Sequence, residues 1–128
     1  MRLLLDTHAF LWFILDDPKL SETAKALISD ADNLVEISPA SYWEIAIKIS
    51  LGKYALPEPY GSFMERELAT NHFGILPIEP KHTAILTELP FHHRDPFDRL
   101  LVAQAICERI PLVSVDPALD AYAVTRLW

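Results

Sequence analysis

Two short stretches of the chain have the same character, RLLLD at residues 2–6 and LVSVD at residues 112–116. Each is an apolar run that ends in an aspartate, which is typical of a buried strand. Between them, strand-like runs alternate with helix-like segments, the pattern of βαβ units in a mostly parallel sheet. Ligands of such sheets bind beyond the carboxyl ends of the strands. The sequence therefore predicts that Asp6 and Asp116 lie at the same edge of one sheet.

The remaining elements follow from periodicity, caps and breakers. Ser21 is a helix N-cap, Pro39 suits a first helical turn, and Gly52 suits the position after a helix. We expect strands at 2–5, 34–37, 74–78, 112–115 and 124–127, and helices at 7–15, 21–31, 39–51, 62–71, 80–89 and 97–108, with a helical turn at 117–121. The predicted fold is a three-layer α/β/α sandwich with a mostly parallel central sheet, in a single domain that spans residues 1–128.

Composition limits the classes of protein that the chain can represent. With 128 residues, half of them hydrophobic, the chain can bury a sizeable core. No run approaches the roughly 20 apolar residues needed to cross a bilayer. Asp6 follows the first residues too soon for a signal peptide, so we expect a cytoplasmic protein. Cys107 is the single cysteine, which excludes an internal disulfide.

The formal net charge of −7 counts against a nucleic-acid partner, because acidic proteins do not attract nucleic acid over long distances. Without the four candidate site acids described below, the charge would be −3, and two divalent cations would have the same effect. The charge therefore weakens the case for a nuclease without excluding one.

Four acids are candidates for a functional site, and each also has a structural interpretation. Asp6 and Asp116 follow strands, where either could instead cap the helical turn after it. Glu44 could be a surface residue paired with Lys48. However, its helix is apolar around most of its circumference, where an unpaired carboxylate is costly.

The fourth acid is Asp98, in the first turn of the helix expected at 97–108. An acid there is also favourable through the helix dipole. Asp95, three residues earlier, is the natural N-cap before Pro96. If Asp95 caps the helix, Asp98 has no capping duty and is available for a site.

Carboxylates gathered at one edge repel one another unless protons or cations compensate. An acidic set without clustered His or Cys favours hard cations such as Mg²⁺ or Mn²⁺. The five histidines have no zinc-site spacing, and the sequence has neither a glycine-rich phosphate loop nor a nucleophile elbow. The pattern therefore indicates metal-assisted phosphate chemistry.

Four segments of this sequence together resemble the PIN domain, and among PIN domains the VapC toxins of toxin–antitoxin pairs. They are LLLDTH at 3–8, WEI at 43–45, RDPFDRLLVAQA at 94–105 and LVSVDP at 112–117. The resemblance covers essentially the whole chain in order and spacing, and the segment 94–105 is its most specific part.

The resemblance implies an endoribonuclease that uses one or two Mg²⁺ or Mn²⁺ ions. Asp6 and Asp98 would be the principal metal ligands, and Glu44 and Asp116 would complete the site. Thr7, Asp95 and Ser114 would support the acids, although Ser114 stands where the family often has threonine and the part played by Asp95 is open. The expected reaction is hydrolysis by metal-activated water, which leaves a 5′ phosphate and a 3′ hydroxyl.

The resemblance also implies partners. These are RNA, a VapB-like antitoxin, and a second copy of the chain in a homodimer or a toxin–antitoxin hetero-oligomer. The helix at 7–15 is apolar on every side. Together with the apolar helix at 39–51, it suggests a surface for another chain, unless its own fold covers it. RNA contacts are expected at Lys48, Lys53, Arg94 and Arg99, each of which could instead be ordinary solvated charge.

Two other classes of function compete with the nuclease. A receiver-like phosphoacceptor module also places aspartates at strand ends beside Mg²⁺. It would need an acidic pair after the first strand and a lysine after the last, and neither is present. A catalytically silent binding protein of the PIN fold is the other alternative. The intact set of four acids argues against it, because their repulsion would serve no purpose there.

Overall fold

The computed structural model describes all 128 residues and contains one five-stranded sheet in the order β3-β2-β1-β4-β5. The strands are β1 Arg2–Leu5, β2 Leu34–Ile37, β3 Gly74–Ile75, β4 Leu112–Val113 and β5 Arg126–Leu127. Every neighbouring pair of strands is parallel. The prediction of a mostly parallel sheet is therefore confirmed.

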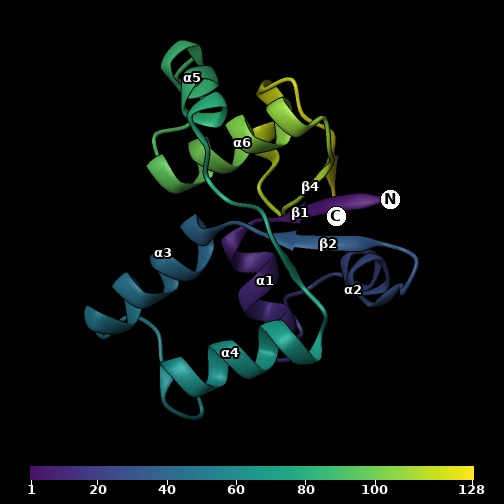
Figure 1. Cartoon of the computed structure of the whole chain (residues 1–128), viewed down its shortest axis with the longest axis vertical. Coiled ribbons are helices and arrows are strands. Elements are labelled where there is room, and N and C mark those ends of the chain that lie inside the picture. Colours follow the sequence, from purple (N-terminus) through teal and green to yellow (C-terminus); the bar gives the residue numbers. More distant parts are fainter.

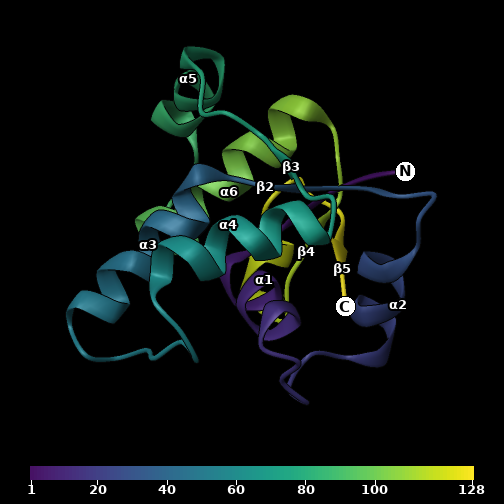
Figure 2. The same cartoon turned by 60° about the horizontal axis from the view of Figure 1, so that its bottom comes forward.

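Six helices cover the two faces of this sheet. They are α1 Thr7–Ile14, α2 Glu22–Ser29, α3 Pro39–Ser50, α4 Tyr60–Thr70, α5 Pro80–Glu88 and α6 Pro96–Glu108, and a short 3₁₀ helix, η1, spans Pro117–Ala121. Helices α5 and α6 lie on one side of the sheet, and α1 to α4 lie on the other (Figure 1). The turned view shows α1, α3 and α4 gathered on the same side (Figure 2).

The side chains of β1 show why three layers form. Leu3 and Leu5 are fully buried in the core cluster under α1, whereas Leu4 is fully buried in the cluster under α6. Successive residues of a strand point to opposite faces, so an unbroken run of leucines requires cover on both sides. The three-layer sandwich follows from this run.

The local signals in the sequence explain the helix ends. The hydroxyl oxygens of Ser21 and Ser38 accept hydrogen bonds from backbone N–H groups in the first turns of α2 and α3. Pro39 is the first residue of α3. Gly52, which follows the end of α3, has φ +73°, a left-handed conformation that suits glycine.

Three strands are shorter than the sequence predicts, and one of them, β5, begins at Arg126 instead of Val124. Strand β3 ends at Ile75 instead of Ile78, because Pro77 has no N–H with which to continue the ladder after Leu76. Strand β4 ends at Val113, because the Ser114 hydroxyl accepts the N–H of Asp116 and the chain turns toward η1.

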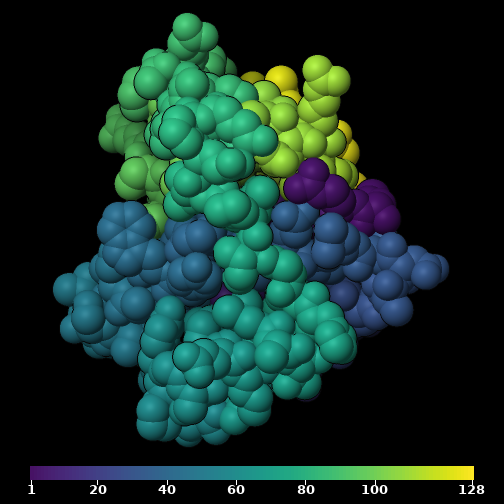
Figure 3. All heavy atoms as spheres, in the orientation of Figure 1, coloured from purple at the N-terminus to yellow at the C-terminus, as the bar shows by residue number.

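The prediction of a surplus apolar surface on α1 is wrong. None of its residues is among the exposed large hydrophobic side chains, because α2, α3 and α4 help to cover it. The exposed apolar residues lie elsewhere, notably Trp43 on α3 at 60 % and Phe91 before α6 at 83 % exposed. In the space-filling view the first residues of the chain, coloured purple, lie at the surface (Figure 3). No helix is long and apolar enough to span a membrane.

Candidate metal centre at the carboxyl edge of the sheet

Asp6 and Asp116 lie at the carboxyl ends of the adjacent strands β1 and β4, as the sequence predicts. The N–H of Asp6 donates to Val113 O at 3.0 Å, which holds the two strand ends together. Both residues also cap helices, since Oδ1 of Asp6 accepts from the N–H of Ala9 and Oδ1 of Asp116 from that of Ala118. A carboxylate has a second oxygen, so the capping role leaves ligand capacity at each residue.

Glu44 projects from α3 and is only 4 % exposed. The ion pair with Lys48 that the sequence suggests is present, with 3.8 Å between Lys48 Nζ and Glu44 Oε2. The negative charge of Glu44 raises the pKa of both Asp6 and Asp98, although it is the smallest of the causes in each case. Glu44 is therefore a buried acid that faces the same group of carboxylates.

Asp98 lies in the first turn of α6, and Asp95 takes over the capping of this helix. The Oδ1 atom of Asp95 accepts the N–H groups of Phe97 and Asp98 at 2.8 and 3.1 Å. This division of roles matches the sequence argument. The carboxylate of Asp98 makes no capping bond and faces His93, with 3.5 Å between His93 Nε2 and Asp98 Oδ2.

The positively charged side chains beside these acids do not fully offset their negative charge. Burial raises the pKa of Asp98 to about 7, and the nearby charges of Asp95, Asp6 and Glu44 add to the shift while His93 opposes it. Burial also raises the pKa of Asp6, and a hydrogen bond from the Ser114 hydroxyl opposes that shift. Such shifts are expected where carboxylates are crowded at a site that a cation would neutralise.

His93 joins this group, although the sequence analysis did not include it. Its Nε2 lies 2.9 Å from Asp116 Oδ2, and these atoms and Oδ2 of Asp98 all lie within 4.8 Å of one another. Its Nδ1 accepts the N–H of Asp95, so a neutral ring carries its proton on Nε2 and donates it to Asp116. The histidines have no zinc-type spacing that would single out His93, and its nearness to Asp95 and Asp98 in the sequence is the signal that could have identified it.

The predicted supporting hydroxyls have different surroundings. Ser114 is fully buried beside two acids, since its hydroxyl accepts the N–H of Asp116 and lowers the pKa of Asp6. The hydroxyl of Thr7 instead hydrogen-bonds Ser41 at 3.2 Å and so joins α1 to α3. Ser114 orients the acids directly, whereas Thr7 supports the packing beneath them.

Arg99 does not have the surroundings of an RNA contact, and this part of the prediction needs correction. Its guanidinium is turned inward and donates to Pro90 O at 2.8 Å and to Leu89 O at 3.2 Å. The ring of Phe91 covers it, with 3.9 Å from the ring centre to Cζ. Arg99 therefore holds the loop before α6. Of the other three cations, Arg94 and Lys53 are exposed and Lys48 is half-buried.

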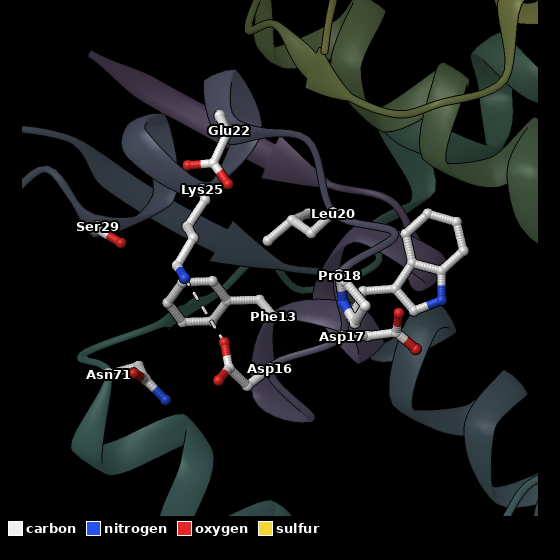
Figure 4. A pocket seen from close by; sticks show the side chains of 10 residues that line it. Phe13, Asp16, Asp17, Pro18, Leu20, Glu22, Lys25, Ser29 and Asn71 are labelled. Atoms are coloured by element: carbon white, nitrogen blue, oxygen red, sulfur yellow. Dashed lines mark ion pairs between the residues drawn. The ribbon is translucent and has the colours of Figure 1, made fainter.

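Two other features are poor candidates for a metal centre. His82, Cys107 and Glu108 lie close together, but Nδ1 of His82 already accepts the N–H of Glu79 and its Nε2 contacts Glu108. The largest cavity, about 530 Å³, lies beyond the end of α1 and contains none of the four acids. An ion pair between Lys25 and Asp16 crosses it beside Phe13 (Figure 4).

The comparisons with known proteins agree with this architecture. The family model described as PIN domain matches residues 3–124. The chain belongs to the PIN domain family. This PIN domain is 30 % identical over 124 residues to ribonuclease VapC22 of Mycobacterium tuberculosis, a match that covers 96 % of this chain and 93 % of VapC22. It is 35 % identical over 71 residues to ribonuclease VapC16 of the same organism, a match that spans half of each chain.

Solved structures share the fold of this PIN domain. VapBC2 from Rickettsia felis, bound to a DNA fragment from its promoter, contains a chain that matches with a TM-score of 0.72 and 19 % identity over 99 % of this chain and 98 % of that one. FitAcB from Neisseria gonorrhoeae matches with a TM-score of 0.68 and 19 % identity over 98 % and 96 % of the two chains. At these identities the likeness establishes the fold alone.

Proposed function

We propose that this PIN domain is a metal-dependent endoribonuclease and the toxin of a toxin–antitoxin pair. One observation carries the proposal, namely that acids from four separate segments lie near one another at the carboxyl edge of the sheet, where the pKa values of Asp6 and Asp98 are raised although Lys48 and His93 are close by. The relatives VapC22 and VapC16 are ribonucleases by name, which supports RNA as the substrate. RNA as substrate also favours the cytoplasm as the place of action.

The side chains present fit a hard divalent cation. The donors are carboxylate oxygens, which Mg²⁺ and Mn²⁺ prefer, and the raised pKa of Asp98 reflects the positive charge that is lacking. We assign Asp6 and Asp98 as principal ligands and Glu44 and Asp116 as additional ligands of one or two ions. A bound cation would supply Lewis acidity at the phosphate and lower the pKa of water.

The side chains around the cation would divide the remaining tasks. Asp116 is the least buried of the four acids, and we assign it to accept the proton of the attacking water. His93 and Ser114 would keep Asp116 in place through the hydrogen bonds already described. In-line attack at phosphorus would leave a 5′ phosphate and a 3′ hydroxyl on the RNA fragments.

The proposed protein partners are supported by the relatives and by the exposed apolar side chains. The chains in VapBC2 and FitAcB are solved in complexes, which supports a cognate antitoxin of the VapB type and a homodimer or toxin–antitoxin hetero-oligomer here. The exposed Trp43 and Phe91 are the kind of aromatic side chains that protein interfaces cover. Lys48, Lys53 and Arg94 remain the proposed contacts to RNA.

Cleavage of a mixed tRNA and rRNA pool by antitoxin-free protein tests this function. The pool is incubated with Mg²⁺, with Mn²⁺ or with EDTA, and Asp6→Asn is compared with wild type. The matched control is Asp32→Asn, because Asp32 is an exposed aspartate in the turn before β2.

The expected result is a set of discrete fragments with 5′ phosphates that require both the metal and Asp6 and are unaffected by Asp32→Asn. Fragments ending in a cyclic 2′,3′-phosphate would contradict the mechanism. Absence of cleavage by folded, metal-loaded protein across the pool would favour the silent binding protein.

A further inference from the structure

Aromatic and basic side chains gather on one surface beside the acids. The aromatic members are His8, Trp12 and Tyr54. The basic members are Lys19, Lys48 and Lys53, three of the five lysines in a chain of net charge −7. We call these six residues the aromatic–lysine surface. It is built from α1, the loop after α1, the end of α3 and the loop after α3.

The side chain of His8 contacts the other two aromatic side chains. The ring of exposed His8 lies 5.2 Å from that of Trp12 with a tilt of 33°, and His8 Nε2 is 3.3 Å from Tyr54 Oη. Trp12 also meets the edge of Trp128 at 5.9 Å. The rings are therefore held in place before any ligand arrives, while His8 stays exposed and Tyr54 half-exposed.

The lysines lie around these rings. Lys48 Nζ is 5.5 Å from the centre of the Tyr54 ring, and Lys19 Nζ is 5.9 Å from that of Trp12. Lys53 lines a small cavity of about 230 Å³ together with Trp12, Tyr54 and Lys19, and Asp17 is the one acid in its lining. The lysine ion pairs of this protein involve Lys25, Lys48 and Lys81, so Lys19 and Lys53 have no carboxylate partner.

The surface is continuous with the acids at two points. His8 is two residues from Asp6, and its charge acts on the pKa of Asp6. Lys48 pairs with Glu44. A strand that occupies this surface would therefore place its next phosphate close to the acids.

We propose that the aromatic–lysine surface binds a single-stranded segment of RNA and presents the neighbouring phosphodiester to the acids. Bases stack on His8 and Tyr54, and Lys53 and Lys19 contact phosphates. Aromatic faces beside cations are how proteins bind single strands, whereas the bases of an A-form duplex are already stacked and cannot reach such faces. This inference rests on the proposed function, since it specifies the form of RNA that the nuclease would take.

Binding of a labelled eight-nucleotide RNA of mixed sequence, followed by fluorescence anisotropy in EDTA, tests the surface without cleavage. The charge variant is Lys19→Ala/Lys53→Ala, and its matched control is Lys25→Ala/Lys81→Ala, which makes the same change in net charge elsewhere. The ring variant is Tyr54→Ala, with Tyr54→Phe as the control that keeps the ring. An abasic oligomer and a duplex of the same length serve as comparison ligands.

The charge variant is expected to raise Kd about tenfold and to reduce the slope of log K against log salt by about 1.4, or about 0.7 for each phosphate contact. Its control stays within about twofold of wild type. Tyr54→Ala is expected to raise Kd about fivefold for the RNA but not for the abasic oligomer, and Tyr54→Phe binds as wild type does. The duplex binds more weakly than the single strand.

Equal Kd values for the charge variant and its control would overturn the proposal, as would a duplex that binds as tightly as the single strand. The surface would then be available to a protein partner instead. Cleavage of the RNA pool separates this outcome from failure of the proposed function. Cleavage without dependence of binding on the surface refutes only the surface, and surface-dependent binding without cleavage refutes only the nuclease.

Discussion

Helix α6 has an acid at each end, and the two acids have opposite properties. Asp98 in the first turn has a pKa raised to about 7, whereas Glu108 in the last turn has a pKa lowered to about 2. The helix dipole alone would act in the other direction, because it favours negative charge at the N-terminus and disfavours it at the C-terminus. Local surroundings therefore outweigh the dipole at both ends.

The surroundings differ in the charge that faces each acid. Glu108 hydrogen-bonds His82 at 2.9 Å and pairs with Lys81 at 3.1 Å and Arg2 at 3.3 Å, which lower its pKa. Asp98 lies among other acids, whose charges add to the effect of burial on its pKa, and the basic side chain close to it is His93. The comparison teaches that Glu108, which stabilises the fold, pairs with a lysine and an arginine, whereas Asp98, a proposed principal metal ligand, faces only a histidine.

The largest expected effect is on RNA cleavage. Asp98→Asn should lower cleavage at least about 100-fold, because it removes a proposed principal metal ligand. Glu108→Gln, the matched change at the other end of α6, should leave cleavage within about twofold of wild type. Initial rates at saturating Mn²⁺ measure both, and equal losses in the two variants would remove the functional distinction between the two ends.

The same two variants should have the opposite order of effects on stability, with Glu108→Gln the more damaging of the two. Glu108→Gln should lower the free energy of unfolding by about 1–3 kcal/mol, because it weakens charged hydrogen bonds. Asp98→Asn should raise the stability of the metal-free protein by about 1 kcal/mol, or roughly 3–6 °C in Tm, since it relieves repulsion. Thermal unfolding in EDTA checks both signs. A lower Tm for Asp98→Asn would mean that its carboxylate is structural.

His93 sharpens the comparison, because it is the one basic side chain close to Asp98. His93→Ala should lower cleavage about tenfold, since Asp116 and the N–H of Asp95 lose their partner. His82→Ala, which removes the corresponding histidine beside Glu108, should affect Tm but not cleavage. Single-turnover rates and Tm measured on both variants distinguish the two roles.

The smallest effects are in the pH dependence of stability. The folded pKa of Asp98 is raised, so its contribution to the stability of metal-free protein falls as pH rises from about 4 to 7. The folded pKa of Glu108 is lowered, so its contribution is present above about pH 4.5 and is lost as pH falls toward 2. Urea unfolding across pH, with wild type compared with each variant, should give these opposite trends. Parallel profiles for the two variants would contradict the pKa shifts.

Much of the fold and of the acid set could be predicted, because the signals are local. The leucine run of β1 requires a covered sheet and brings Asp6 to its edge, and the capping role of Asp95 leaves Asp98 free. Pro77 could also have predicted the early end of β3. What could not be predicted depends on contacts between distant segments. Arg99 turns inward because the Leu89 and Pro90 carbonyls are there to accept its hydrogen bonds.

Two further features, the loop before α6 and the ion-pair network at the end of α6, could not be predicted from the sequence for the same reason. The position of His93 beside Asp116 depends on how residues 90–96 cross the edge of the sheet, which periodicity does not determine. The pairing of Glu108 with Arg2 joins residues 106 positions apart. Residue type alone therefore did not distinguish the structural Glu108 from the proposed metal ligand Asp98.

Calorimetric titration with Mn²⁺ at pH 7 tests the central claim most directly. Wild type and Glu108→Gln should bind Mn²⁺ with similar affinity and release protons, so that the heat varies with the ionisation enthalpy of the buffer, because Asp98 is partly protonated before the ion arrives. Asp98→Asn should bind at least about tenfold more weakly and lose this proton release. Unchanged Mn²⁺ binding by Asp98→Asn, or no binding by wild type at millimolar Mn²⁺, would contradict the assignment of these acids to a metal centre.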